Sequence, residues 1–585
     1  MVIILSGDRP ELALSLGGIR ELTVNLGGNT EVWHPRTRRG QTRCLIDQTA
    51  TIHIGVFWSF DSRWGFGFEI DVRSDPNARI LCWLTTPPKW GDASSLQSMW
   101  RTITSSSETL TREYVWVAGN LVVLDIGKTL SKVSVWTPQG ELLEKRERRN
   151  QRCYSDGRMV LDTCGIEEWL TKTLAELPNK QRIGGIIPVA HGAAAALIRD
   201  GRLAAPVMDY ESPISPKVRE SYEAERDPFA QTGSPALPDG LNLGVQLHRM
   251  EQLQPELFNH GTQIVTWPQY WSWLLSGVAS TEVTSLGCHT DLWNPTTAAP
   301  SSMAVRRGWA ALLAPLKPAG QPLGRLSKHW LERTGLPATV DVYCGIHDSN
   351  AALVAARSHQ ELEGSEVTVL STGTWFVAMR SHSISSIVNP SLLPSERDVL
   401  VNVDVAGRPV PSARFMGGRE IHLLTVLTSR QIDIVADQPA IIEAATQVLS
   451  RGTMVLPTLA RGCGPYPQRR GGWVRKPDEE LQQRAAASLY VALMADAALE
   501  LIGTRKNLLI EGRFAGAKVF AQSLACLRPN LRTFISSLEA DVAQGALRLV
   551  HPKESLGAPL QPVLPLDLDL DTYRVRWKAY AESAA

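Results

Sequence analysis

The pattern of apolar and polar positions predicts a strand, a tight turn and a second strand early in the chain. Four apolar residues, Leu121–Leu124, run into Asp125, and a glycine at position 127 then interrupts the run. The following segment, Ser131–Trp136, alternates as a half-buried strand does. We therefore expect a hairpin with an aspartate at the mouth of its turn.

The residues of this turn also have functional chemistry. Backbone N–H groups around Gly127, the Lys128 ammonium and the Thr129 hydroxyl are groups that bind phosphate, and the Asp125 carboxylate can hold a hydrated Mg²⁺. A P-loop is excluded, because its first glycine would fall at Val122 and a helix would have to follow the threonine. For this stretch alone, an ordinary hairpin remains the alternative.

A second unit of the same kind lies in Glu366–Arg380. An apolar, β-rich run leads into a short turn and a second apolar run follows; the turn residues are Ser371, Thr372, Gly373 and Thr374. Two such units in one chain indicate two related domains that face one nucleotide.

Strand and helix patterns alternate through most of the chain, which predicts an α/β fold. Helices are expected over Cys164–Leu177, Leu241–Leu257, Trp267–Leu275, Ser349–Ala356 and Glu480–Ile502, and strands over Arg182–Val189, Ala205–Glu211 and Val340–Cys344. Leu508–Leu527 is expected to form a strand, a glycine turn and a helix.

Length and composition narrow the class of protein. A chain of 585 residues, 43% hydrophobic and 20% charged, has the composition of a globular protein with two or three domains. Its formal charge of +1 gives no electrostatic reason to expect nucleic acid or a membrane surface as partner. The eight cysteines show no metal-binding spacing, and the start of the chain lacks the basic residues of a signal peptide. We expect a cytoplasmic enzyme with reduced thiols.

The first part of the chain, Met1–Glu113, differs from the rest. It has six tryptophans, Lys89 as its one lysine and no sustained periodicity. Residues 1–115 are therefore expected to be an extension of unknown role. It is either an additional module or a segment upstream of the natural start of the protein, and the second interpretation is favoured.

From about Trp116 onward, the order and spacing of these motifs resemble the FGGY family of carbohydrate kinases, within the actin-like, ribonuclease H-like ATPases. The resemblance implies two ribonuclease H-like domains with a central cleft. Residues 116–360 would bind the sugar and form the first phosphate loop, and residues 361–585 would bind the nucleotide.

The resemblance is most specific at Gly345–Ala351. The family has a glycine, a variable pair, an aspartate and then small residues that open a helix, and this sequence matches that pattern with Asp348 as the aspartate. The resemblance implies that Asp348 is the catalytic base. The structural alternative is that Asp348 only caps the helix.

The resemblance also assigns the ligand-binding groups. Asp125 would contact Mg²⁺, and the phosphates would be bound by Gly127, Lys128, Thr129, Thr372, Gly373 and Thr374. Gly512 and Gly516 would flank the adenosine, although the family commonly has two or three adjacent glycines there. The sugar would contact His191, Asp209, Glu211, His289 and Thr290, for which a loop histidine and solvated acids at a strand end are the structural alternatives.

The implied activity is transfer of the γ-phosphoryl group of Mg·ATP to a hydroxyl of a ketose or related sugar. Asp209–Glu211 and the His289–Thr290 pair resemble the kinases of deoxy-L-ketohexoses (rhamnulose, fuculose) more than those of glycerol, which implies such a sugar as substrate. An actin-like ATPase without sugar kinase activity and a non-catalytic sugar sensor are the alternatives. The expected partner is the sugar, and a second copy in a homodimer is an option. Neither nucleic acid nor a membrane is expected as a partner.

Overall fold

The structure, a computed structural model, describes residues 119–583 apart from 382–387, 426–430, 537–540 and 553–558, together with the backbone of eight strands between residues 2 and 83. The chain divides into two compact units, Met1–Glu113 and Tyr114–Ala585. All of the expected site residues belong to the larger unit.

The smaller unit contains two antiparallel sheets, ordered β1-β2-β5 and β4-β3-β8-β7-β6. Their strands are β1 (Val2–Ile4), β2 (Glu11–Ser15), β3 (Leu22–Leu26), β4 (Asn29–Trp33), β5 (Thr42–Leu45), β6 (Ile52–Trp58), β7 (Phe66–Val72) and β8 (Arg79–Trp83). These strands were not expected from the sequence, and the role of residues 1–115 as an extension stays a prediction. The sequence of β7, FGFEIDV, alternates as a strand does, and this was the signal that could have revealed them.

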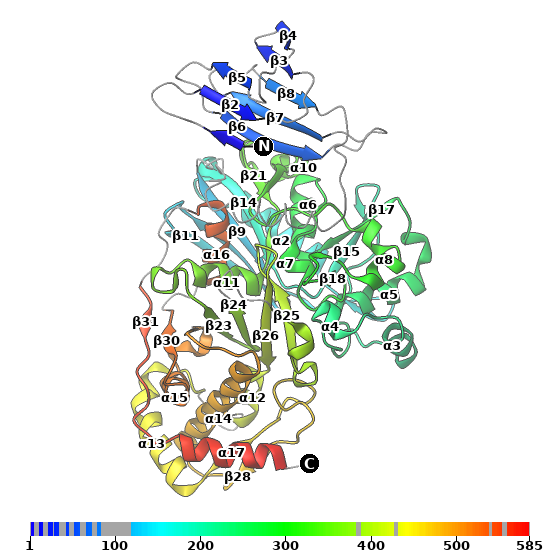
Figure 1. Ribbon diagram of the computed structural model, residues 1–585. Helices are drawn as coiled ribbons and strands as arrows, with labels where there is room; N and C mark the ends of the chain where they lie inside the picture. Colours follow the sequence, from blue (N-terminus) through cyan, green and yellow to red (C-terminus); the bar gives the residue numbers. More distant parts are fainter. Residues whose placement is uncertain are drawn as a thin grey trace. The chain divides into compact units, whose positions relative to one another are not determined.

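The first sheet of the larger unit has the order β11-β10-β9-β14-β21-β20 (Figure 1). Its strands are β9 (Asn120–Ile126), β10 (Leu130–Trp136), β11 (Leu142–Arg149), β14 (Ile183–Ala190), β20 (Pro322–Arg325) and β21 (Asp341–Tyr343). β9 and β10 form the expected hairpin, closed by the Gly127 N–H donating to the Leu130 carbonyl (3.0 Å). β14 runs parallel to both β9 and β21.

The second sheet, β25-β26-β24-β23-β29-β30-β31, repeats this arrangement. Its strands are β23 (Val367–Thr372), β24 (Phe376–Ser381), β25 (Val399–Val403), β26 (Pro409–Phe415), β29 (Asn507–Gly512), β30 (Arg532–Ile535) and β31 (Gln561–Pro562). β23 and β24 are an antiparallel hairpin, and β23, β29 and β30 are parallel, as β9, β14 and β21 are in the first sheet. The duplicated α/β unit expected from the sequence is confirmed.

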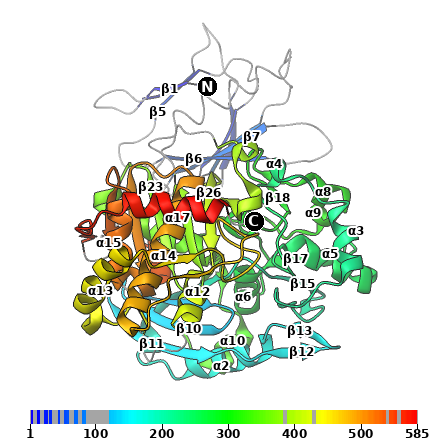
Figure 2. The ribbon, with the colours of Figure 1, turned by 90° about the horizontal axis from the view of Figure 1, so that it is seen from below.

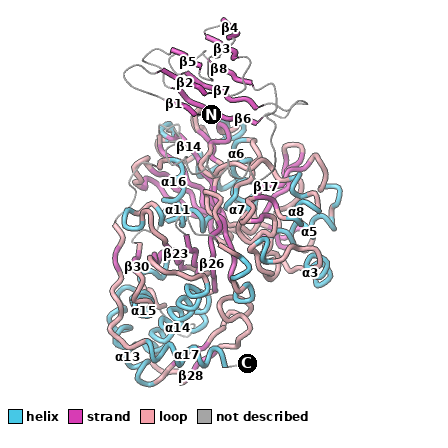
Figure 3. The backbone as a smooth tube through the Cα atoms, in the orientation of Figure 1, coloured by secondary structure: helices cyan, strands magenta, loops and turns pink. Residues whose placement is uncertain are grey.

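Helices cover the sheets at the expected places (Figure 3). They include α2 (Thr163–Ala175), α5 (Leu243–Leu253), α6 (Trp267–Ser276), α11 (Asp348–Arg357), α14 (Glu480–Leu501) and α15 (Lys518–Leu527). The alanine-rich α14 is buried along nearly its whole length, because its small side chains let α13 (Gln438–Arg451), α15 and the second sheet approach closely (Figure 2). The core of the second lobe is built around this helix.

A helix near the C-terminus returns to the first sheet. Ala546 and Leu547 of α16 (Asp541–Val550) share an apolar cluster with Val123 and Val189 (Figure 1). α16 also lies directly on α11, so close that a Cβ on Gly545 would clash with the backbone of α11. The helix that begins at Asp348 is thus held by both halves of the chain.

One expected strand is wrong. In Ala205–Glu211, only Met208 pairs, in a single antiparallel bridge to Val160, and the chain then turns, with the Ser212 N–H donating to the Asp209 carbonyl (2.9 Å). An apolar run satisfies the strand pattern, but a ladder needs a neighbour alongside, and β13 (Arg158–Val160) passes for one residue only. The turn is what directs the Asp209 and Glu211 side chains.

Two further observations concern the described part of the chain. None of its helices combines the length and the apolar composition that crossing a membrane requires. Its six cysteines are free; they are Cys153, Cys164, Cys288, Cys344, Cys463 and Cys526.

Candidate active site

Three of the expected site residues meet at one edge of the first sheet. β9 and β14 are parallel, and β22 (Ile346–His347) runs parallel to the end of β14. Asp125 is the next-to-last residue of β9, His191 follows β14, and Asp348 follows β22. The carboxyl ends of adjacent parallel strands are where open α/β sheets bind their ligands. The fold thus brings together side chains from three separate stretches of sequence.

Asp125 is a half-buried carboxylate with one cationic partner. Lys132 Nζ lies 3.1 Å from its Oδ2. Burial raises the pKa of Asp125, Lys132 opposes the rise, and the negative charge of Asp348 adds to it. Two carboxylates that repel each other favour a bound cation, and Mg²⁺ commonly takes one or two protein carboxylates and completes its shell with phosphate and water. The residues present fit such an ion.

Asp348 is the first residue of α11, and its two oxygens differ. Its Oδ1 accepts a hydrogen bond from the Ser349 backbone N–H (2.6 Å) and lies 3.2 Å from His347 Nε2. Its Oδ2 has no hydrogen-bond partner among the described residues. The capping position of α11 belongs to His347, so Asp348 is not a simple cap. One oxygen is fixed, and the other is free to accept a proton.

A network behind Asp348 was not found from the sequence. The Asn350 side-chain amide donates to His347 Nδ1 (3.2 Å). An amide N–H only donates, so Nδ1 accepts and Nε2 carries the proton that faces Asp348. Burial lowers the pKa of His347, which keeps the ring neutral. The signal for this contact in the sequence is local spacing alone, because Asn350 lies three residues after His347 at the start of a helix.

A cavity of about 120 Å³ connects the first turn with the expected sugar-binding residues. Its lining includes Gly127, Lys128, Thr129, His191, Asp209, Glu211 and Trp267. Lys128 Nζ lies 2.7 Å from Asp209 Oδ1 and 2.8 Å from Glu211 Oε2. Lys128 therefore pairs here with two acids of the sugar side, and its contact with phosphate stays a prediction.

His191 presents a hydrogen-bond donor that lacks a partner. Its Nδ1 accepts from the Ala193 backbone N–H (3.3 Å), and its buried Nε2 has no partner among the described residues. Burial lowers the pKa of His191 to about 4, with opposing contributions from Asp348 and Asp209. The neutral ring therefore carries its proton on Nε2, where it is available to a hydroxyl oxygen of a ligand.

His289 and Thr290 differ in what they offer. His289 Nδ1 donates to the Leu241 carbonyl (2.7 Å), and burial lowers its pKa to about 3. The Thr290 hydroxyl donates to the Leu286 carbonyl and accepts from the Leu292 N–H (3.1 Å). Thr290 thus organises the backbone of this loop, while His289 keeps a ring nitrogen for a ligand. The contacts of both with a sugar stay predictions.

The second hairpin lies beside the Gly512 turn. The Thr372 hydroxyl donates to the Glu511 carbonyl (2.6 Å) and accepts from the Phe514 N–H (3.0 Å). Gly512 has a φ of +81°, and a Cβ there would clash with the Thr372 backbone. A Cβ on Gly418 would likewise clash with the Gly373 carbonyl. Thr374 is exposed and a Cβ on Gly516 would meet open space, so both are accessible to a ligand.

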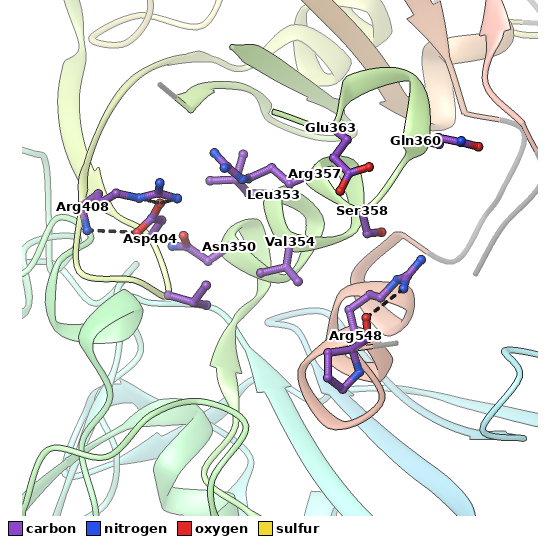
Figure 4. A pocket seen from close by; sticks show the side chains of 12 residues that line it. Asn350, Leu353, Val354, Arg357, Ser358, Gln360, Glu363, Asp404, Arg408 and Arg548 are labelled. Atoms are coloured by element: carbon purple, nitrogen blue, oxygen red, sulfur yellow. Dashed lines mark hydrogen bonds and ion pairs between the residues drawn. The ribbon is translucent and has the colours of Figure 1, made fainter. Parts of the chain in front are cut away.

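A larger pocket of about 500 Å³ lies along another face of α11 (Figure 4). It is lined by Leu353, Arg357, Asp404, Arg408 and Arg548, among others, and Arg408 is paired with Asp404 (2.7 Å). None of the expected site residues lines it.

The fold and its paired hairpins define the class of actin-like ATPases. Residues 364–558 match the carbohydrate kinase FGGY C-terminal domain. A solved carbohydrate kinase from Novosphingobium aromaticivorans is 49% identical; the match covers 80% of this chain and 99% of that chain, with a TM-score of 0.75.

Two more distant solved structures share the fold. The xylulose kinase from Lactobacillus acidophilus is 14% identical over 79% of this chain and 97% of that chain (TM-score 0.65). The Plasmodium falciparum glycerol kinase with ADP is 13% identical over 80% and 98% (TM-score 0.63).

The chain belongs to the FGGY family of carbohydrate kinases. It is a phosphotransferase with an alcohol group as acceptor, and it uses ATP. The resemblance, the fold class and the enzyme class expected from the sequence are confirmed.

Proposed function

We propose that this kinase transfers the γ-phosphoryl group of Mg·ATP to a hydroxyl of a ketose or related sugar, with Asp348 as the general base. The observation that carries the proposal is the asymmetry of Asp348. Its Oδ1 is held by the Ser349 N–H and by His347, while its Oδ2 has no partner among the described residues. The charge of the Asp348 carboxylate also contributes to the raised pKa of Asp125, after burial, which is the main cause. A base needs such an available oxygen within reach of the reacting hydroxyl.

In the proposed reaction, Asp348 Oδ2 accepts the proton of the sugar hydroxyl as its oxygen attacks the γ-phosphorus. The new bond joins the sugar oxygen to phosphorus, and the bond between phosphorus and the β,γ-bridging oxygen breaks, which releases ADP. His191 Nε2 donates to a sugar oxygen, and the acids Asp209 and Glu211 accept from sugar hydroxyls. Positioning and charge neutralisation account for most of the catalysis in such transfers.

The two hairpins are proposed to hold the phosphates from opposite sides. Gly127 and Thr129 would act from the first, and Thr372, Gly373 and Thr374 from the second, with Gly512 and Gly516 against the adenosine. Mg²⁺, held through Asp125, would neutralise negative charge on the phosphates. Closure of the two lobes would exclude water, so that the sugar and not water is phosphorylated.

The acceptor is proposed at the level of a ketose or polyol. The deoxy-L-ketohexose implied by the resemblance is one candidate, and xylulose and glycerol, for which structural neighbours are named, are others. The homodimer and the cytoplasmic location stay predictions.

A coupled assay that measures ADP release tests this function. The panel should contain rhamnulose, fuculose, xylulose, ribulose, glycerol and gluconate, each with and without Mg²⁺. We expect sugar-dependent ADP release for at least one ketose, and its loss in Asp348→Asn. ATP hydrolysis that no sugar stimulates would support an ATPase without sugar kinase activity, and sugar binding without ADP release would support a sensor.

A further inference from the structure

One side chain of the first turn contacts three consecutive residues of the expected sugar-binding wall. The Lys128 ammonium lies 2.7 Å from Asp209 Oδ1 and 2.8 Å from Glu211 Oε2. It also lies 4.2 Å from the ring centre of the intervening residue, Tyr210, within the range of a cation–π contact. Only 14% of the Lys128 side chain is exposed. The lysine is thereby fixed on the sugar side of the turn.

Separate hydrogen bonds hold the two turns that Lys128 joins. In the first turn, Asn150 Nδ2 donates to the Gly127 carbonyl (2.9 Å) and to the Lys128 carbonyl (3.2 Å). In the turn of the sugar wall, Asp209 Oδ1 accepts from the Glu211 backbone N–H (2.8 Å). These contacts do not involve the lysine side chain. Its ammonium therefore connects one independently held turn to the other.

Each of the two acids keeps one oxygen for a ligand. Asp209 and Glu211 contact the same ammonium, so their carboxylates are close enough to repel each other without it. Asp209 Oδ2 and Glu211 Oε1 have no hydrogen-bond partner among the described residues, and both side chains line the cavity of about 120 Å³. An ionised carboxylate only accepts hydrogen bonds, so sugar hydroxyl groups suit these oxygens.

We propose that Lys128 is a positioning and specificity-determining residue of the acceptor site: it holds Asp209 and Glu211 side by side, so that their remaining oxygens accept from hydroxyl groups on neighbouring carbons of the sugar. This inference rests on the proposed sugar kinase function. To bind a phosphate instead, the ammonium would have to leave the two carboxylates without their counterion. Because the backbone of Lys128 belongs to the proposed phosphate turn, this one residue also fixes the sugar wall relative to that turn.

The test compares sugar and ATP kinetics in variants of Lys128. Lys128→Met removes the ammonium and keeps a chain of similar length, and Lys128→Arg keeps the charge. Glu211→Gln and the double variant Lys128→Met/Glu211→Gln complete a cycle, and the double variant also relieves the repulsion that Lys128→Met creates. Lys578→Met is the matched control, because it opens a Lys–Glu pair between α17 (Asp571–Ser583) and Glu500 (2.5 Å), neither of which lines the sugar cavity.

We expect KM for the sugar to rise about 10- to 100-fold in Lys128→Met, with KM for ATP unchanged, because two charged acceptors lose their alignment. Lys128→Arg should lie between this variant and the wild type, and Lys578→Met should match the wild type. Lys128 and Glu211 act on the same hydroxyl contacts. The rise in the double variant should therefore be smaller than the product of the rises in the two single variants.

Monodeoxy analogues of the best sugar test the hydroxyl pair itself. In the wild type, removal of either of two neighbouring hydroxyl groups should raise KM. In Lys128→Met, the same analogues should cause a smaller further rise, because the two acids no longer hold those hydroxyl groups in place. Analogues that lack a hydroxyl elsewhere should show the same relative KM in both proteins.

Three results would overturn the inference while leaving the kinase function intact: a rise confined to the KM for ATP, an unchanged sugar KM in folded Lys128→Met, or single rises that multiply in the double variant. If Lys128→Met does not fold, the sugar KM of the double variant is compared with that of Glu211→Gln, and equal values overturn the inference. Failure of the wild type to phosphorylate any sugar would instead contradict the proposed function itself.

Discussion

His347 Nε2 lies 3.2 Å from Asp348 Oδ1, and Asn350 fixes the tautomer of the ring from its other side. This places a neutral donor on one oxygen of the proposed base and leaves the second oxygen for the sugar. We regard His347 as a positioning residue, because it reaches the sugar only through Asp348.

His347→Gln should lower kcat about 3- to 10-fold, the effect of losing one aligning hydrogen bond. KM for ATP and for the sugar should stay the same, since both binding surfaces remain. Steady-state kinetics and a melting curve on the same preparation check this. A fall in melting temperature with unchanged kcat would assign His347 to stability alone.

Asp125→Asn tests the proposed metal contact. The variant keeps the size of the side chain but removes the negative charge that would attract Mg²⁺. We expect the Mg²⁺ concentration for half-maximal turnover to rise about tenfold or more, with little change in sugar binding. The measurement is a Mg²⁺ titration at saturating ATP and sugar. Normal Mg²⁺ dependence together with a lowered melting temperature would instead identify Asp125 as a structural partner of Lys132.

Gly512→Ala tests the nucleotide side of the cleft. The φ of +81° disfavours a side chain there, and a Cβ would push against the Thr372 backbone in the second phosphate loop. We expect a stability loss of about 1–3 kcal/mol and weaker ATP binding. Gly364→Ala is the control, since its φ is +65° but its Cβ would meet open space. It should lose some stability and keep its ATP affinity.

The pH dependence of stability should report the buried His191. Its pKa is about 4 in the folded protein against 6.5 ordinarily, so the unfolded chain takes up a proton that the folded chain does not. The contribution of a neutral His191 is present above pH 6.5 and is lost as the pH falls toward 4, by up to about 3 kcal/mol. As the pH falls from 6.5 toward 4, the melting temperature of the wild type should therefore fall more than that of His191→Asn. A difference that does not vary with pH would contradict the burial of a neutral imidazole.

Local pattern was enough to predict the two hairpins and the helix at Asp348. In each, the apolar run, the glycine and the helix-opening residues are neighbours in sequence, so periodicity and turn chemistry reveal them. The same holds for α14, whose alanine-rich pattern predicted a helix almost to the residue. These elements also carried the family resemblance.

The features that the sequence left open depend on the packing of distant segments. Lys128 pairs with Asp209, 81 positions away, and no local signal indicates that the turn lysine would meet the sugar-side acids. The expected strand at Ala205–Glu211 failed because strand formation needs a neighbouring partner, which periodicity does not reveal.

The central claim is that Asp348 removes the proton from the sugar hydroxyl, and Asp348→Asn tests it most directly. The asparagine keeps the start of α11 and the hydrogen bond from the Ser349 N–H, but it does not accept the proton. We predict that kcat and kcat/KM fall together by about 10²–10⁴-fold, with ATP affinity and melting temperature close to those of the wild type. A folded variant that retains near-wild-type kcat on the best sugar would contradict the account.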